Sequence, residues 1–288
     1  MKFVDLLLLV LSTFFLGTNF VAVKIGVEQF PPLFMMAMRF TLVAVLLIPF
    51  VKAPRDRMFQ VFLISVSMGT AHFGLFFIGI SGVDAAITAI IFQLGVPFSI
   101  IFAWLFLHET FGRRRAFGIL IAFVGVIFIA GTPGSQSSHL HMFIVLASVF
   151  AWGIAAVQIK RLRDVDAITL TAWMALFSAP QLYLISAITE SGQITSLSTA
   201  GVSGWSALLY ATFGASIIGY GLWYHLIGKY DVNQVVPLTL LNPLFAIAAA
   251  VIILGENLSI GIIIGGILTL TGVFVVQMRS RQASTPQT

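Results

Sequence analysis

The chain has 288 residues, of which 59% are hydrophobic and 9% are charged, and its formal net charge is +5. Soluble domains carry about 25% charged residues, so 15 Lys and Arg with 10 Asp and Glu do not supply a polar surface beside 27 Phe. This composition excludes a water-soluble domain and favours a membrane protein. The basic residues lie between apolar runs, which argues against a nucleic-acid-binding surface, and the absence of Cys excludes disulfides and thiolate metal sites.

Apolar runs of the length needed to cross a membrane, about 20 residues as a helix, follow one another along the chain. No small-residue cleavage pattern follows the first run, so we interpret it as a membrane span rather than a signal peptide. We predict an all-α polytopic membrane protein with ten transmembrane helices. They lie at about residues 3–27, 33–51, 59–80, 84–107, 114–131, 140–159, 168–189, 205–228, 234–254 and 259–278.

Lys and Arg in the loops are confined to one side of this predicted topology. They precede the first span or follow every second one: Lys2, Lys52, Arg55, Arg57, Arg113, Arg114, Arg115, Lys160, Arg161, Arg163, Lys229, Arg279 and Arg281. The opposite loops carry carboxylates such as Glu28, Asp84, Glu190 and Glu256, without Lys or Arg. Because Lys and Arg are retained on the cytoplasmic side, both termini are predicted to be cytoplasmic.

The two halves of the chain resemble each other. One offset of 136 aligns Ser12, Phe14, Gly17 and Lys24 with Ser148, Phe150, Gly153 and Lys160. A later offset of 147 aligns Gly74, Asp84, Phe98, Glu109, Gly118, Gly125 and Val126 with Gly221, Asp231, Phe245, Glu256, Gly265, Gly272 and Val273. The 11 extra residues are attributed to a longer loop around Gly192 to Gly204.

We therefore predict two repeats of five helices, residues 1–138 and residues 139–288, the second ending in a short cytoplasmic tail. Five is an odd number, so the second repeat enters the membrane in the opposite orientation. Inverted repeats of this kind place the substrate site at their interface and operate by alternating access.

Several short motifs resemble the EamA family of the drug/metabolite transporter superfamily. They are Gly17-Thr18-Asn19-Phe20 leading to Lys24, Pro31-Pro32 followed by Arg39-Phe40, His108-Glu109 and Gly255-Glu256. The run from Gly219 through Trp223 and Lys229 to Leu238 is similar to the cysteine and O-acetylserine exporter type.

This resemblance implies a ten-helix fold, a central cavity between the repeats, and export of amino acids or related metabolites. The chain has Leu16 where many relatives have Trp, so no aromatic contact is assigned there.

Two cations inside predicted spans, Lys24 and Arg39, are candidates for binding a substrate carboxylate. Ionisable residues within a span usually face the bundle interior or a wet cavity, and Arg offers a planar fork for bidentate contact. The alternative is structural: Lys24 extends to the interface, and Arg39 holds helix ends through backbone carbonyls.

Neutral polar and aromatic side chains form a second candidate set: Asn19, His72, Gln93, Trp152, Tyr220 and Asn242. Amides bind a zwitterion without the cost of burying a charge, although they also hydrogen-bond neighbouring helices. Trp152 lies near the middle of its span, away from the interfacial aromatic belt, where a ring can contact a small solute.

Proton coupling needs a titratable group, and the candidates are His72, Glu109 and Glu256. Glu109 and Glu256 have an alternative role, which is to pair with a basic loop or to end a helix. Without a coupling group, the protein would be a uniporter or an exchanger.

No Walker loop, nucleophile elbow or His-Glu-x-x-His motif occurs, so we expect no enzyme and no cofactor. His139 and His141 alone are a weak metal signal, and no metal site is predicted. We predict a secondary transporter of the bacterial inner membrane that contacts lipid and exports metabolites of cysteine, O-acetylserine or threonine size, with no required protein partner and no nucleic acid. A monomer satisfies this prediction, and the glycines of several predicted helices are equally compatible with a dimer. The alternatives are an exporter of drugs or lipophilic cations, and a membrane enzyme or scaffold.

Overall fold

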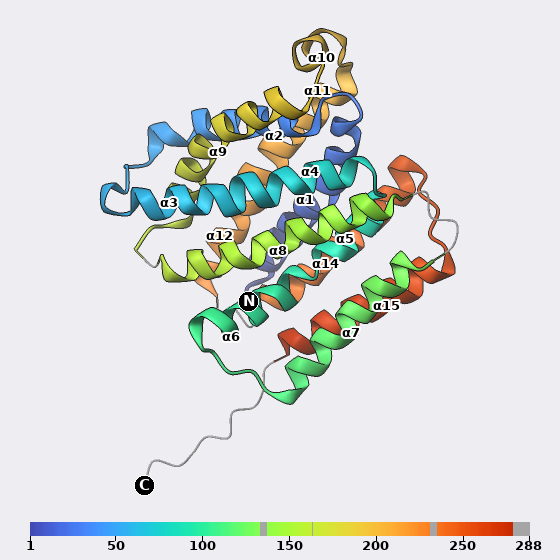
Figure 1. Cartoon of the computed structure of the whole chain (residues 1–288). Helices are drawn as coiled ribbons and strands as arrows, with labels where there is room; N and C mark the ends of the chain where they lie inside the picture. Colours follow the sequence, from blue (N-terminus) through green and yellow to red (C-terminus); the bar gives the residue numbers. More distant parts are fainter. Residues whose placement is uncertain (133–136, 163, 231–234, 279–288) are drawn as a thin grey trace.

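The chain folds into a bundle of α-helices (Figure 1). The computed structural model describes residues 1–132, 137–162, 164–230 and 235–278, and no β-strand occurs among them. Arg163, Asp231, Arg279 and Arg281 lie outside the described residues. The α-helices are α1 (Phe3–Val27), α2 (Pro32–Leu47), α3 (Met58–Ile64), α4 (Phe73–Ser81), α5 (Ala85–Phe92), α6 (Gly95–Leu107), α7 (Arg113–Ala130), α8 (His139–Arg161), α9 (Ala167–Thr189), α10 (Gln193–Thr199), α11 (Val202–Leu209), α12 (Tyr220–Lys229), α14 (Leu241–Ala249) and α15 (Ile260–Gln277).

Eight helical runs in the described part of the chain are long and apolar enough to cross a membrane. They are Phe3–Val27, Pro32–Phe50, Arg55–Ser81, Ala85–Leu107, His139–Arg161, Ala167–Thr189, Val202–Lys229 and Ile260–Gln277. The other two predicted spans correspond to the shorter apolar helix Leu238–Leu254 and to α7, whose first turn carries three arginines. For the described residues, the prediction of an all-α protein with many helices of the length and apolar composition needed to cross a membrane is confirmed.

One local prediction is wrong. The segment expected to be a loop around Gly192 to Gly204 contains α10, because Gly192 turns the chain at φ 81° and a new helix begins at Gln193. The Gln193 amide donates to the Ser186 and Glu190 carbonyls, which anchors α10 to the end of α9. The predicted span from about 84 to 107 corresponds to the run Ala85–Leu107, which a turn at Gln93 and Leu94 divides into α5 and α6.

Stretches of π-helix occur at corresponding positions of the two halves. They are η3 (Ser65–His72) and η4 (Tyr210–Gly219), and a third stretch is η6 (Ala250–Leu254). The offset of 147 carries residues 65–72 onto residues 212–219, inside η4. π-Helical turns are rare in proteins, and those that occur are often found at functional sites. The paired stretches η3 and η4 therefore indicate a functional site near them.

Tight helix contacts repeat in the same way. A Cβ added to Gly17 would lie 2.8 Å from the Cβ of Phe245, and one added to Gly153 would lie 2.9 Å from the Cβ of Phe98. The two glycines are related by the offset of 136 and the two phenylalanines by the offset of 147. Only glycine permits these approaches, so the two halves share a packing detail as well as a sequence pattern.

Corresponding helices of the two halves pack against each other in antiparallel fashion. In α7 and α15, Gly118 abuts the Gly272 carbonyl and Gly125 abuts the Gly265 carbonyl, so numbers rise along one helix as they fall along the other. Figure 1 shows this pair side by side. In α2 and α9, the Leu33 amide bonds to Glu190, and further along Thr41 bonds to Tyr183.

The loops that carry Lys and Arg are joined to one another by side-chain contacts, and we call this end of the bundle the basic end. Its contacts are the ion pairs Arg57–Asp164, Lys160–Glu109 and Lys229–Asp5, and the bond from Arg161 to the Phe106 carbonyl. These contacts link the loops predicted to share one side of the membrane.

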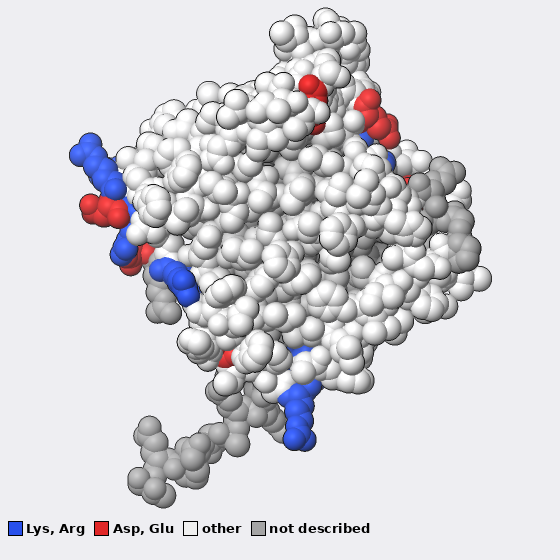
Figure 2. Space-filling view, viewed as in Figure 1, with Lys and Arg blue, Asp and Glu red and all other residues white. Residues whose placement is uncertain are grey.

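The opposite end is joined by carboxylates and amides, and we call it the acidic end. Glu190 accepts bonds from the Leu33 and Phe34 amides at 2.8 and 3.1 Å, and Glu256 accepts from the Ala85 and Ala86 amides at 2.6 and 3.0 Å. A carboxylate at a helix N-terminus satisfies unpaired amides and complements the helix dipole. Figure 2 shows charged side chains at the margins of the molecule with a broad uncharged region between them.

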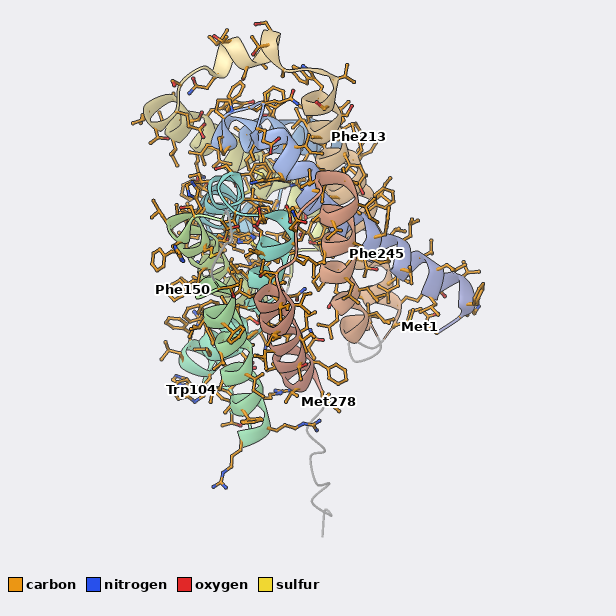
Figure 3. The ribbon with its side chains drawn as sticks, turned by 90° about the vertical axis from the view of Figure 1, so that its right-hand side faces the viewer. Met1, Trp104, Phe150, Phe213, Phe245 and Met278 are labelled. Carbon is orange, nitrogen blue, oxygen red and sulfur yellow. The ribbon has the colours of Figure 1, made fainter. Side chains whose placement is uncertain are left out.

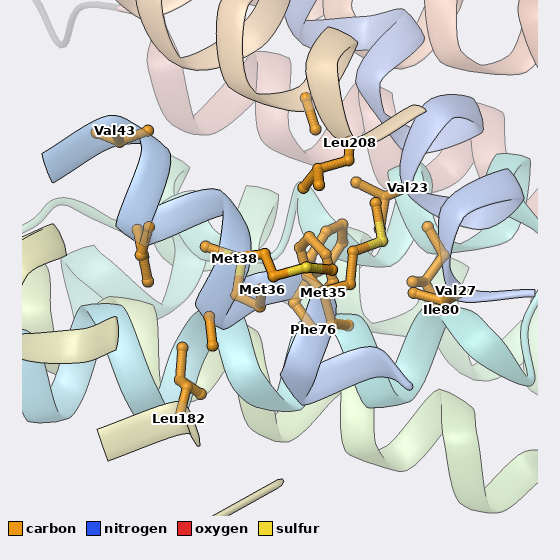
Figure 4. Close-up of a cluster of buried hydrophobic side chains, with 14 of the residues drawn as sticks. Val23, Val27, Met35, Met36, Met38, Val43, Phe76, Ile80, Leu182 and Leu208 are labelled. Atoms are coloured by element: carbon orange, nitrogen blue, oxygen red, sulfur yellow. The ribbon is translucent and has the colours of Figure 1, made fainter. Parts of the chain in front are cut away.

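The helices bury apolar side chains inside the bundle and expose others around it. Met35 and Met36 of α2 are fully buried in the largest core cluster, which also contains Phe76 of α4 (Figure 4). Trp104 and Phe150 are exposed on one flank and Phe213 on the other, as Figure 3 shows. Exposed aromatic side chains around an apolar bundle are compatible with lipid as the surrounding solvent.

Candidate functional site

A cavity of about 260 Å³ lies between helices of both halves. Its walls combine a few polar groups with several aromatic rings, which is the usual composition of a small-molecule site. The lining residues are Leu16, Asn19, Phe20, Arg39, Phe73, Phe76, Phe92, Gln93, Val96, Trp152, Tyr220, Trp223, Thr239, Asn242 and Gln277. Six of the eight sequence-predicted substrate residues are therefore brought together here: Asn19, Arg39, Gln93, Trp152, Tyr220 and Asn242.

Arg39 is the charged residue of this lining, and its side chain is buried, with the residue only 2% exposed. Its Nε and Nη2 atoms donate to the Ser216 hydroxyl at 3.2 and 2.9 Å, and its Cζ atom lies 5.8 Å from the centre of the Phe73 ring. Its Nη1 atom is buried without a hydrogen-bond partner among the described residues. The described lining contains no Asp or Glu, so these residues give the guanidinium no counter-charge in the cavity wall.

The π-helical stretch η4 positions the partner of Arg39. Ser216 lies within η4, and its hydroxyl donates to the Ala211 carbonyl five residues earlier at 3.2 Å. Widening the helix by one residue turns this hydroxyl towards α2, where it accepts from Arg39. Phe73, which packs against the guanidinium, directly follows η3. Both π-helical stretches therefore support the same buried cation.

An aromatic wall faces the cavity on the side of α5 and α8. Trp152 stacks on Phe92 with 5.8 Å between ring centres and 23° between planes. Gly95, at the start of α6, makes room for the indole, because an added Cβ would lie 1.7 Å from it. His72 lies behind this wall, 1% exposed, with its Nδ1 atom 2.8 Å from the Ser148 carbonyl and its ring 6.2 Å from Trp152. The structure thus places His72 outside the cavity lining.

Amide side chains from different helices complete the polar lining. Asn19 belongs to α1, Gln93 to the turn between α5 and α6, and Asn242 to the first turn of α14. Gly17 allows α1 to approach α14 at this level, since an added Cβ would lie 2.4 Å from the Asn242 carbonyl. The amide oxygens of Asn19, Asn242 and Gln277 are buried without hydrogen-bond partners among the described residues.

Lys24 lies towards the acidic end and outside the cavity lining. Its ammonium donates to the carbonyls of Ile80, Ser81 and Val83 at 3.0, 3.2 and 2.9 Å. An ammonium has three donors, and all three are used at the end of α4. Lys24 therefore caps this helix, and its use for substrate would require breaking these bonds.

The two acidic coupling candidates lie at opposite ends of the bundle. Glu109 is exposed at the basic end and pairs with Lys160. Glu256 caps the first turn of α5 at the acidic end, where burial raises its pKa and the bonds from Ala86 and Ala85 oppose this effect. The nearby charges of Asp84 and Lys24 act in opposite directions on the same pKa.

Sequence reasoning missed several lining residues, of which Gln277 and Thr239 are the polar ones. Gln277 ends α15, and its position inside a predicted span, after four apolar residues, was an available signal. Thr239 lies in the 3₁₀ stretch η5 (Val236–Leu240), before α14. Nothing in the hydropathy pattern distinguished the lining rings of Phe73, Phe76 and Phe92 from the other phenylalanines.

An apolar helical bundle with an internal cavity between two related halves is the architecture of many secondary membrane transporters. The family model described as EamA-like transporter family matches residues 4–131 and again residues 139–278. The chain therefore belongs to the EamA-like transporter family, within the drug/metabolite transporter superfamily, as its motifs predict.

Individual relatives agree with this assignment. A Salmonella typhimurium protein named "Probable amino-acid metabolite efflux pump" is 30% identical over 268 residues, covering 90% of each chain. An Escherichia coli protein of the same name is 29% identical over 268 residues, also covering 90% of each chain. A crystal structure that shares 16% sequence identity superposes with a TM-score of 0.64 and covers 96% of each chain, which supports the fold.

Replacing Glu256 with Gln should change how stability depends on pH. A carboxyl group whose pKa is higher in the folded state than its ordinary value of 4.5 binds more protons when folded. The free energy of unfolding therefore decreases as the pH rises from about 4.5 through the higher folded-state pKa. Thermal unfolding in detergent across this pH range should show a smaller decrease for E256Q than for the wild type. Identical pH dependence in both proteins would contradict the raised pKa.

Proposed function

We propose that this chain is a secondary transporter that exports small carboxylate-bearing metabolites, in particular amino acids or their derivatives of cysteine, O-acetylserine or threonine size. The observation that carries the proposal is Arg39, a buried guanidinium in a cavity whose described lining contains no Asp or Glu. A buried charge without a partner is strongly unfavourable. A solute carboxylate supplies the missing counter-charge and can bind the guanidinium through two parallel hydrogen bonds.

The size of the cavity and the names of the relatives support the same substrate class. Pockets for drug-sized ligands have volumes of about 300–1,000 Å³, and this cavity, at about 260 Å³, is smaller. The relatives named as amino-acid metabolite efflux pumps cover most of the chain. A lipophilic cation would meet the positive charge of Arg39 without a carboxylate in the described lining, although the aromatic rings would attract it.

The architecture that we propose has ten spans in two inverted five-helix repeats, residues 1–138 and 139–288, with both termini in the cytoplasm of a bacterial cell. Three features support it: the antiparallel pairing of α2 with α9 and of α7 with α15, the matching π-helical stretches η3 and η4, and the separation of basic and acidic ends. Rocking of one repeat against the other would expose the cavity to each side in turn.

Export also requires the orientation that the basic loops predict. The chain contains no cysteine, so single cysteines introduced at Lys52 and Asn257 report on the two ends without background. In intact cells, a membrane-impermeant maleimide should label Asn257→Cys, and it should label Lys52→Cys only after permeabilisation. The reverse pattern would show that the basic end faces outwards and would contradict the proposed orientation.

The role of Arg39 can be tested by counterflow in proteoliposomes with labelled L-cysteine, L-threonine, O-acetyl-L-serine and one lipophilic cation. Replacing Arg39 with Gln should reduce amino-acid counterflow by roughly 10- to 100-fold, because a charge-assisted hydrogen bond contributes about 1.5–3 kcal/mol. Arg57→Gln is the matched control, since Arg57 forms an exposed ion pair with Asp164 at the basic end.

Three outcomes of this assay are informative. Loss of amino-acid counterflow in R39Q but not in R57Q supports the proposal. Equal counterflow in both variants, with normal folding, would exclude Arg39 as a substrate contact. Counterflow of the lipophilic cation alone would contradict the proposed class of carboxylate-bearing substrates and would favour an exporter of lipophilic cations. Repeating the assay with an imposed pH gradient distinguishes proton coupling from uniport or exchange. His72, Glu109 and Glu256 stay the candidates for proton coupling.

A further inference from the structure

Buried polar atoms without partners are concentrated in the cavity. Seven buried side-chain nitrogen and oxygen atoms have no hydrogen-bond partner among the described residues, and four of them belong to cavity-lining residues. These four are Arg39 Nη1, Asn19 Oδ1, Asn242 Oδ1 and Gln277 Oε1. Because buried polar atoms in proteins are nearly always paired, this group needs an explanation in terms of what the cavity binds.

The four atoms are of two chemical kinds. Arg39 provides a hydrogen-bond donor with a positive charge, whereas Asn19, Asn242 and Gln277 each have an amide oxygen, which is an acceptor without net charge. The three amides come from α1, α14 and α15, so they meet in the cavity from separate helices. Rotation about the last side-chain bond, a torsion with broad preferences, is sufficient to turn an amide oxygen towards the cavity that its residue lines.

From this arrangement we propose that Asn19, Asn242 and Gln277 form a subsite for the primary ammonium group of the transported solute. An ammonium has three N–H donors, which match three carbonyl-type acceptors. The inference rests on the proposed function, because it takes Arg39 as the partner of the solute carboxylate. It goes further by requiring a free amine on the same molecule.

The absence of carboxylates from the described lining explains why such a subsite would select a zwitterion. An Asp or Glu beside the ammonium would form an ion pair with Arg39 and remove the charge that attracts the solute carboxylate. Neutral amides avoid this competition, since they bind an ammonium through their dipoles and leave Arg39 without an anionic partner in the described lining. The solute then carries both charges, and its own carboxylate neutralises Arg39.

Gln277 is the residue of this group with the clearest test, because it is the last residue of α15 and lines the cavity. Asn242, by contrast, also lies where α1 and α14 approach closely through Gly17. A change at Gln277 therefore affects the subsite with less disturbance of helix packing. The matched control is Gln158 of α8, whose amide oxygen accepts from Ser67 and which does not line the cavity.

The experiment compares an amino acid with otherwise similar molecules that lack a free ammonium. Labelled amino-acid counterflow in proteoliposomes is competed with unlabelled L-cysteine, N-acetyl-L-cysteine and 3-mercaptopropionate, and the same series is repeated with L-threonine, N-acetyl-L-threonine and 3-hydroxybutyrate. The wild type should prefer the free amino acid at least tenfold in each series. Gln277→Leu should lower the apparent affinity for the amino acid about tenfold and leave the apparent affinities for its two analogues unchanged. Gln158→Leu should keep the wild-type preference for the free amino acid.

The outcomes separate this inference from the proposed function. If the wild type takes the deaminated and N-acetylated acids as well as the amino acids, the ammonium subsite is wrong and carboxylate recognition by Arg39 stands. If no carboxylate competes or is transported, both proposals fail. Preference for the free amine that is the same in Gln277→Leu as in the wild type would remove Gln277 from the subsite. The wild-type comparison needs no variant, so a poorly folding variant does not prevent the test.

Discussion

In lipid, every backbone N–H and C=O group must find a partner within the protein, because no water is available to provide one. This constraint accounts for the all-helical fold, and it also determines how the helices end. Glu190 and Glu256 accept from the first amides of α2 and α5, and Lys24 donates to the last carbonyls of α4. Each of these three side chains comes from another part of the chain, so satisfying a helix end simultaneously joins two segments of the bundle.

Against this background of paired polar groups, most of the unpaired buried side-chain atoms among the described residues belong to the cavity lining. Among the described residues, Arg39 retains an unpaired donor, and three lining amides retain unpaired acceptors. The surrounding structure maintains this arrangement through the π-helical stretches, since η4 supplies Ser216 to Arg39 and η3 leads into Phe73. Polar groups that the protein leaves unpaired, held by structure that is repeated in both halves, are what a binding site for a small polar solute requires.

Much of the fold could be predicted from the sequence, because span length and the distribution of Lys and Arg follow directly from the properties of a bilayer. The turn at Gln93 and the π-helical stretch Ser65–His72 could not, since such local geometry depends on contacts between helices; beside the turn, for example, Gly95 packs against Trp152. The short helix α10 was missed because its polar sequence resembles a loop and its anchor is the Gln193 side chain.

The candidate site was predictable in part for a related reason. Polar residues within a span usually face the interior, and this rule alone indicates Asn19, Arg39, Gln93 and Asn242 as candidates. The rule does not predict which neighbouring helix a given side chain faces, and the hydropathy pattern does not help because nearly all faces of these helices are apolar. It therefore does not show that Lys24 reaches the α4 carbonyls, that His72 lies behind Trp152, or that Gln277 lines the cavity.

The central claim is that the cavity around Arg39 binds the transported solute, and cysteine protection tests it most directly. Because the chain has no native cysteine, a single Val96→Cys variant places one thiol in the cavity lining, with Lys52→Cys in an exposed loop as the control. The rate of labelling by N-ethylmaleimide should fall for Val96→Cys when the amino acid that supports counterflow is added, and stay constant for Lys52→Cys. An unchanged labelling rate of Val96→Cys at saturating amino acid would contradict the account.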